Sequence, residues 1–502
     1  MMPDQPPLPT LARSTVQVIV AVLCCGLIAT VWIWSQDPLG KAGMMILLVP
    51  LAGVLLPLVN APFELALAFV VLSYFRIPEV FPVLIPFHLP ELLAGATLGA
   101  LAWHLLGTHR MRPHWSPELS LFAALFAFVT LSTVLAIDRP IALDYWASTY
   151  VKIAVMVPAI AWLASSPRQF ARAGRAFLLA GLVVGGVALW NKAHGIGLVE
   201  GTRVTIGRDI DSVLGDPNDL SLVLLFSTSF GLAFAVTRGI PVFSRLLGAL
   251  SFLVTLLAIV ATQSRGGLLG VGGVLLAIAP PAPRWRLPFL IVGALFVAGL
   301  FVVSGIGERS VVLEGGGDLD PSAMGRLSAW TTAVHMALAR PLNGVGLGNF
   351  VAQYYFFSTE WTGRPYAAHS TWFQVLGEIG VPGFITFVAL IGVLAYNIHR
   401  AKFLLTGADA ATRAMILALM ASLAGFVISG SFLSQAFTWP IYIITALGVA
   451  VSRYANRFEV VPHRNTADSN GYRDPSVDDD LLPSGRKPVP DRATISAREF
   501  YN

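Results

Sequence analysis

Three polar side chains with the chemistry to bind and activate a phosphorylated substrate stand near the ends of apolar segments. Arg208 lies in GTRVTIGRDIDSVLGDPNDL, Arg265 in ATQSRGGLLG and His369 in GRPYAAHSTWFQVLGEIGVPG. A guanidinium can hold two phosphate oxygens at once, and a neutral imidazole can take a proton from an attacking hydroxyl. What these residues can do together depends on the elements that position them.

His369 directly precedes a predicted helix. Thr371 and Gln374 have the spacing of a capping box, which places the helix start near Thr371. The positive end of that helix dipole would favour a neutral, basic imidazole. The alternative is that His369 only forms local hydrogen bonds. Glu378 would face away from His369 on an ideal helix, so the two are not paired.

Arg265 is predicted at a short turn between two apolar segments. Gly266 and Gly267 follow it and would let a ligand approach the backbone closely. A lone arginine at such a boundary can equally anchor its helix at the lipid headgroups. The sequence leaves both interpretations of Arg265 open.

Two more arginines, Arg203 and Arg208, stand upstream of a helix start in the segment DPND (216–219). The helix start does not explain them. Asn218 in that segment is a candidate lining residue. Arg326 and Trp330 are further candidates, because they share one face of a helix predicted over 323–340. The following run GVGLGNF (344–350) is predicted to be a tight turn rather than a dinucleotide site.

The elements that position these residues are predicted to be membrane-spanning helices. Of the 502 residues, 55% are hydrophobic and only 12% are charged, about half the charge of a typical soluble domain. Spanning helices need about 20 apolar residues. We expect an all-α polytopic protein with about 12–14 transmembrane helices, from the candidate segments 15–34, 42–59, 61–76, 90–106, 117–137, 146–164, 174–190, 218–236, 243–261, 266–280, 285–305, 381–397, 412–429 and 432–452.

Arginine and lysine in alternate loops predict the orientation. They gather in the loops around Arg110, Arg172, Arg238, Arg284 and Arg400, which should therefore be cytoplasmic. Both termini are then cytoplasmic, and Arg208, Arg265 and His369 face outward. We expect a transmembrane domain over 1–453 with one large periplasmic loop over 306–369. Residues 454–502 are predicted to be a disordered cytoplasmic tail.

Several classes of site and partner are disfavoured. Cys24 and Cys25 are adjacent, so they predict neither a disulfide nor a metal site. The net charge of +5 reflects scarce acids, so no nucleic-acid surface is expected. No metal or other cofactor is expected. Asp209 and Asp211, as D-I-D, keep a metal-dependent transferase as a minor alternative.

Taken together, these segments resemble the O-antigen ligase and polymerase family of bacterial membrane glycosyltransferases. The matching pieces are GDPNDL (215–220), TQSRGG (262–267), and the block running from GRLSAW (325–330) through RPLNGVGLGNF (340–350) to AHSTWFQVLGEIGVPG (368–383). The resemblance covers roughly 190–400. The earlier spans match only in hydrophobic layout, and the tail matches nothing.

The resemblance implies a C-type glycosyltransferase fold in the bacterial inner membrane. A glycan on undecaprenyl diphosphate would pass to an acceptor hydroxyl at the periplasmic face, with inversion and without a metal. His369 would be the base. Arg265 would bind the diphosphate, together with Arg208 or, second in rank, Arg203. Arg326 is a weaker match to a functional residue of the family.

The acceptor stays open, because lipid A–core, a growing glycan and a protein hydroxyl all fit the resemblance. Function classes other than a transferase are also considered. A flippase for lipid-linked oligosaccharides would suit the number of spans, but internal repeats and midplane charges are not evident. A non-catalytic scaffold of an export complex would predict that Arg265 and His369 are replaceable.

Overall fold

The structure, a computed structural model, describes residues 61–109, 111, 113–280, 282–304, 321–359, 361, 363–405 and 407–457. The predicted spans 15–34 and 42–59, the cysteines and most of the predicted tail lie outside these residues. Throughout the described part the regular elements are helices. They are α3 (Pro62–Tyr74), α4 (Ile77–Val80), η1 (Pro82–Phe87), α5 (Leu89–Ala102), η2 (Trp103–Gly107), α6 (Pro117–Val134), α7 (Arg139–Tyr145), η3 (Trp146–Tyr150), α8 (Val151–Leu163), α9 (Pro167–His194), η4 (Arg208–Ile210), η5 (Val213–Gly215), α10 (Pro217–Val236), α11 (Val242–Thr262), α12 (Arg265–Ile278), α13 (Pro283–Val303), α15 (Pro321–Ala339), α16 (Phe350–Phe357), α17 (Thr371–Leu404), α18 (Ala410–Gly430) and α19 (Trp439–Asn456).

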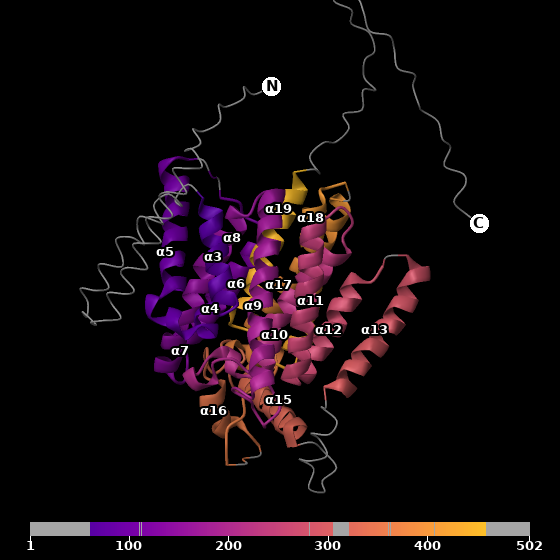
Figure 1. Ribbon diagram of the computed structural model, residues 1–502. Helices are drawn as coiled ribbons and strands as arrows, with labels where there is room; N and C mark the ends of the chain where they lie inside the picture. Colours follow the sequence, from indigo (N-terminus) through magenta and orange to yellow (C-terminus); the bar gives the residue numbers. More distant parts are fainter. Residues whose placement is uncertain are drawn as a thin grey trace, which may run out of the picture. The chain divides into compact units, whose positions relative to one another are not determined.

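The protein is a polytopic membrane protein. In the described part, nine helical segments are long and apolar enough to cross a bilayer, and a helix satisfies its backbone hydrogen bonds internally, as lipid requires. Two shorter apolar helices, α3 and α12, coincide with the predicted short spans. The remaining predicted span, 432–452, becomes α19. Every predicted span within the described residues therefore has a helical counterpart (Figure 1).

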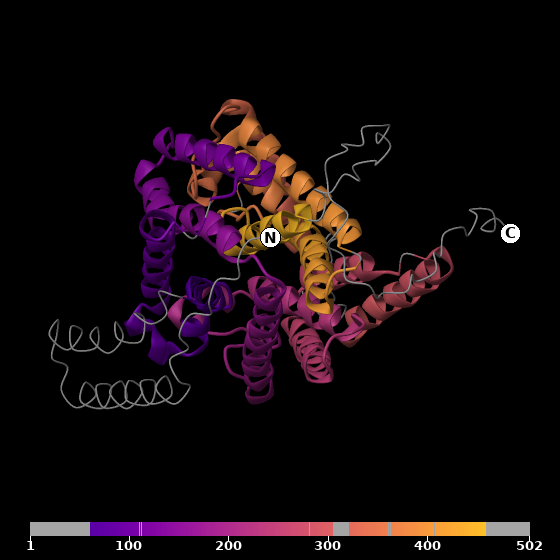
Figure 2. The ribbon, with the colours of Figure 1, turned by 90° about the horizontal axis from the view of Figure 1, so that it is seen from above.

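Helix α19 is the most enclosed of the long helices. Fifteen of its residues are buried, and it packs against α8, α17 and α18 (Figure 2). At the opposite extreme, α13 has no buried residue and contacts α11 and α12. Burial of α19 among other helices explains why its sequence is less uniformly apolar than those of its neighbours. Protein rather than lipid surrounds it.

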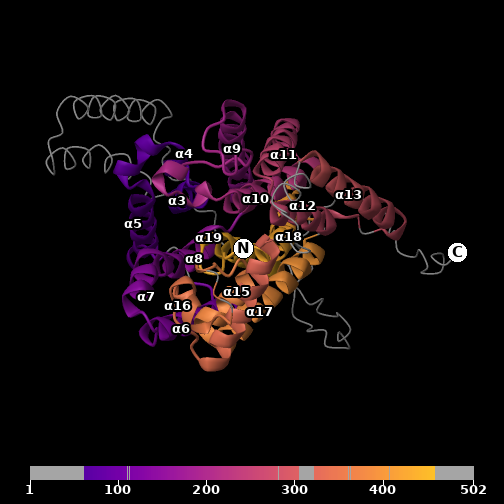
Figure 3. The same ribbon diagram turned by 90° about the horizontal axis from the view of Figure 1, so that it is seen from below.

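The connections gather at two faces of the helical bundle. One face carries the loop between α9 and α10 together with α15 and α16, at the bottom of Figure 1 and toward the viewer in Figure 3. We call it the loop face. Basic loops meet at the other face, where the Arg413 guanidinium donates to the Arg238 carbonyl at 3.0 Å. Helices α10, α12, α17 and α19 all begin at the loop face.

A small apolar core holds α15, α16 and the residues before α17 together. It includes Met336, Val345, Phe350, Tyr354 and Ala368. The helix predicted over 323–340 is confirmed as α15. The predicted tight turn at 344–350 is also confirmed, with Gly344, Gly346 and Gly348 all at positive φ. This core holds Ala368, and with it the residues that precede α17, at the loop face.

Helix α17 is interrupted where the residues Gly380, Pro382 and Gly383 in the sequence predict a kink or break. Gly380 has φ 73° and ψ −174°, and the Val381 amide donates outside the helix to the Pro341 carbonyl at 2.8 Å. A Cβ at position 380 would lie 2.6 Å from the same carbonyl oxygen. Only glycine fits there, so the first turns of α17 form a separate segment that ends at this break.

Replacing Gly380 with alanine should destabilise the protein, because alanine is both strained at this φ and too close to Pro341. The strain alone is about 1–3 kcal/mol. Thermal unfolding in detergent should show a clear fall in Tm. Gly392→Ala in the same helix is the matched control, since its Cβ would meet nothing within 4 Å. Equal Tm values for the two variants would contradict this account of the break.

Candidate functional site

Three helix N-termini meet at the loop between α18 and α19, residues 431–438. The Thr371 hydroxyl at the start of α17 donates to the Leu433 carbonyl at 2.8 Å. Near the start of α10, Asp219 accepts from the Gln435 amide at 2.6 Å. A helix N-terminus carries partial positive charge and unpaired N–H groups. Together they form a region suited to an anion.

The third N-terminus is that of α12, which begins at Arg265. A Cβ on Gly266 would lie 3.2 Å from Cβ of Phe432, so the backbone here packs closely against the same loop. The Ser264 hydroxyl caps the helix by accepting from the Gly267 amide at 3.1 Å. Arg265 is half-buried at the first position of the helix. The glycines thus serve close helix packing.

His369 sits in a strained turn immediately before α17. Its φ is +44°, a left-handed conformation that costs a non-glycine residue about 1–3 kcal/mol. The Trp330 indole donates to the Ala368 carbonyl at 3.1 Å, and its ring stacks on Phe373 at 5.1 Å and 11°. Trp330 therefore braces the turn that presents His369.

The environment of His369 favours its neutral form. Burial lowers the pKa of the imidazole below its usual value, and the positive charge of Arg326 lowers it further, while Asp216 opposes both. We expected neutrality from the helix dipole, and the structure adds burial and Arg326 as causes. The carboxylate of Asp216 also caps α10, accepting from the Asn218 amide at 2.7 Å. His369 thus lies within electrostatic range of the α10 start.

The start of α17 is where the sequence predicts it, but the capping box is absent. Ser370 is the N-cap, and no side chain caps the helix. The Thr371 hydroxyl points to Leu433 instead, and the Gln374 side-chain oxygen accepts from the Ala436 amide at 3.2 Å. Both side chains therefore form hydrogen bonds with the 431–438 loop, about sixty residues later in the chain, instead of capping the helix.

Arg203 and Arg208 have different surroundings. Arg203 is buried, with Nε donating to the Thr262 carbonyl at 3.1 Å and a terminal nitrogen donating to Asn218 Oδ1 at 2.9 Å. Arg208 lies in η4 and is exposed. Asn218 Oδ1 also accepts from the Ser264 hydroxyl at 2.9 Å. Asn218 therefore connects Arg203 to the start of α12 instead of simply lining a cavity.

The remaining candidates have structural partners. Glu378 is buried and its carboxylate accepts from the Gly348 amide at 2.7 Å, so it fixes the glycine-rich turn. It is not paired with His369, as expected. Asp209 and Asp211 lie at the loop face, and among the described residues no group of three or more potential metal ligands is found.

Sequence reasoning missed Arg76, Asp219 and Gln435. Arg76 follows α3 at φ +53° and forms an ion pair with Glu79 at 2.8 Å. Glu79 in turn accepts from the Ser212 hydroxyl at 2.6 Å, which ties α4 to the loop that carries Arg208. One signal was available. An arginine at the outward end of a predicted span departs from the usual placement of basic residues.

Helix N-termini, arginines and His369 thus gather at the loop face of a polytopic helical protein, an arrangement that could bind an anionic group. Residues 250–388 match the family described as O-antigen ligase. The chain therefore carries an O-antigen ligase domain, and it is a glycosyltransferase-type membrane enzyme of polysaccharide biosynthesis. No curated protein matches the chain. The matched residues include Arg265, Arg326, Trp330 and His369.

The charges around His369 predict opposite pKa changes for two variants. Arg326→Gln removes a positive charge and should raise the pKa of His369, whereas Asp216→Asn removes a negative charge and should lower it. Asparagine still caps α10. The rate at which diethyl pyrocarbonate modifies His369, followed by peptide mass spectrometry across pH, measures the pKa because only neutral imidazole reacts. Shifts of the same sign in both variants would contradict the assignment.

Proposed function

We propose that the protein transfers a glycan from an undecaprenyl-diphosphate donor to an acceptor hydroxyl at the periplasmic face of the bacterial inner membrane. The observation that carries this proposal is the meeting of the α10, α12 and α17 N-termini at one loop, with His369 and Arg265 at two of them. The O-antigen ligase match supports the reaction class. Both chain termini are cytoplasmic in this proposal.

His369 is the base. As the acceptor oxygen attacks the anomeric carbon, its proton passes to the imidazole, and the bond from that carbon to the diphosphate oxygen breaks. Attack opposite the leaving group inverts the anomeric configuration. The lowered pKa of His369 keeps the ring neutral and able to accept the proton at neutral pH. Arg326 contributes indirectly, because its positive charge lowers the pKa of His369 and so favours the neutral ring.

Arg265 and Arg208 bind the diphosphate. Charge grows on the leaving oxygens as the sugar departs, and preorganised guanidinium groups and helix N-termini stabilise it without a metal. Of the two upstream arginines, Arg208 is proposed as the donor ligand because it is exposed, whereas Arg203 is buried in bonds to Thr262 and Asn218. Arg203 acts by holding the loop.

The acceptor is proposed to be lipid A–core, as in a ligase. A growing glycan or a protein hydroxyl would use the same base and the same diphosphate site. The three differ only in the group that is presented to His369. Assaying each acceptor with the same purified protein and donor separates them.

Replacing His369 with alanine should reduce glycan transfer from a lipid-diphosphate donor by about 10²-fold or more, since general-base catalysis contributes about 10²–10⁴-fold. Transfer is measured with purified protein in detergent, with and without a chelator. His335→Ala is the control, because His335 lies in the same outer region bonded to the Phe357 carbonyl. Full activity of His369→Ala would refute the base, and loss of wild-type activity with chelator would refute the metal-free mechanism.

The arginine roles predict a separation between binding and stability. Arg208→Ala and Arg265→Lys should weaken donor binding about tenfold or more with little change in Tm, since lysine keeps the charge but loses the bidentate geometry. Arg203→Ala should lower Tm, because it removes a buried guanidinium that holds Asn218 and Thr262. Exposed Arg364→Ala is the control. Unchanged donor affinity in both Arg208→Ala and Arg265→Lys would overturn the diphosphate site.

A further inference from the structure

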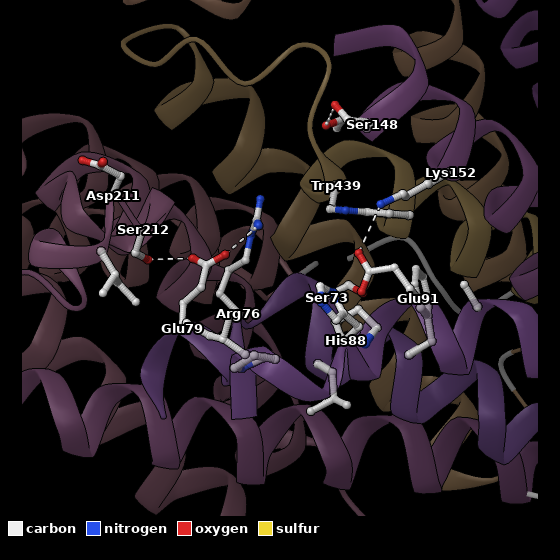
Figure 4. Close-up of a pocket in the computed structure, with 18 residues that line it drawn as sticks. Ser73, Arg76, Glu79, His88, Glu91, Ser148, Lys152, Asp211, Ser212 and Trp439 are labelled. Atoms are coloured by element: carbon white, nitrogen blue, oxygen red, sulfur yellow. Dashed lines mark hydrogen bonds and ion pairs between the residues drawn. The ribbon is translucent and has the colours of Figure 1, made fainter. Parts of the chain in front are cut away.

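A cavity of about 380 Å³ lies beside the loop that carries Arg208. It is bounded by α3, α4, the start of α5, η3 with α8, and Trp439 at the start of α19 (Figure 4). Its volume falls in the range of about 300–1,000 Å³ that small-molecule sites occupy. None of the residues that the sequence singles out for diphosphate binding or proton transfer lines it.

The charged side chains of the cavity neutralise one another. Arg76 is paired with Glu79 at 2.8 Å, and Lys152 is paired with Glu91 at 3.2 Å. Asp211 adds a further carboxylate to the lining. With both cations already paired and an acid in excess, the cavity does not favour a diphosphate. It offers ammonium and guanidinium donors and carboxylate acceptors to a neutral polar ligand.

Hydroxyl groups and an aromatic wall complete the lining. Ser148 and Ser212 contribute hydroxyls, and Ser212 donates to Glu79 at 2.6 Å. Trp439 forms an apolar wall with Phe69, their ring centroids being 5.2 Å apart. A sugar ring has hydroxyls that both donate and accept and a C–H face that packs on aromatic rings. The cavity matches both properties, and its size suits one or two sugar rings.

The backbone around the cavity is strained. Arg76, His88 and Asp211 have φ of 53°, 47° and 53° and all three line it. Each left-handed non-glycine residue costs about 1–3 kcal/mol, and such residues cluster at ligand sites. This observation is independent of the lining chemistry. It indicates that the surrounding structure holds these side chains in position around the cavity.

The cavity adjoins the proposed diphosphate site. Ile210, Asp211 and Ser212 line it and lie two to four residues after Arg208 in the same loop. Arg76 also acts electrostatically on Asp219 at the start of α10. We propose that this cavity binds the sugar unit attached to the donor diphosphate, so that it reads the identity of the glycan while Arg208 and Arg265 hold the phosphates. This inference rests on the proposed donor site.

The test compares two probes, undecaprenyl diphosphate with and without one N-acetylglucosamine, binding to the purified full-length protein in detergent. Wild-type protein should bind the glycosylated lipid about tenfold more tightly. Ser148→Phe fills the cavity and should abolish that preference while leaving the affinity for the bare lipid unchanged. Asp211→Asn should reduce the preference severalfold. Asparagine can adopt the positive φ found at this position, so the backbone should not change. Ala147→Phe, exposed and outside the lining, is the matched control.

The outcomes distinguish failure of the sugar site from failure of the proposed diphosphate site. If wild-type protein binds both lipids equally, or if Ser148→Phe keeps the preference, the sugar site is overturned while the diphosphate site stands. If Ser148→Phe weakens both lipids alike, the cavity binds phosphate and the sugar assignment is wrong. If wild-type protein binds neither lipid, the proposed function fails and the sugar site fails with it.

Discussion

Asn218 accepts hydrogen bonds from Arg203 and from Ser264 through one side-chain oxygen. These two residues lie on either side of α10 and α11 in the chain, so the contact closes the loop after α9 onto the start of α12. Gln435 and Thr371 extend the connection to the α18–α19 loop and to α17. Buried polar groups of this kind are costly unless each finds a partner. Satisfying them fixes three helix starts relative to one another, and the placement of His369 and Arg265 depends on that.

The bilayer explains where irregular backbone occurs. Away from lipid, a chain can turn, break a helix or adopt positive φ, because protein or water pairs the exposed backbone groups. The described chain does so at the loop face, at Arg76, Asp211, Gln263, His369 and Gly380. Of these, Arg76 and Asp211 line the proposed sugar site, Gln263 lies two residues before Arg265, and His369 directly precedes α17. The regular helices that these positions adjoin, in particular the largely buried α19, hold them in place.

The sequence predicted the helices and their order because apolar length is a local property. It predicted the starts of α10 and α17 and the break at Gly380 for the same reason, since proline, glycine and capping residues act within a few positions. It did not separate Arg203 from Arg208, because the difference is a contact with Asn218 and Thr262 that only folding creates. Thr371 and Gln374 were misassigned to a capping box since their partners lie about sixty residues later. Gln435 was missed because its partner Asp219 lies 216 residues earlier in the chain.

The break at Gly380 has a mechanical consequence for how α17 can tilt in a bilayer. A continuous helix tilts as one rod when its apolar length and the bilayer do not match. Here the segment Thr371–Ile379 is bonded to Leu433, Ala436 and, through the break, to Pro341. The segment after Gly380 is the part that spans the lipid. Tilt of the segment after Gly380 is therefore not transmitted as a rigid rotation to His369, and His369 keeps its position while that segment adapts to the surrounding lipid.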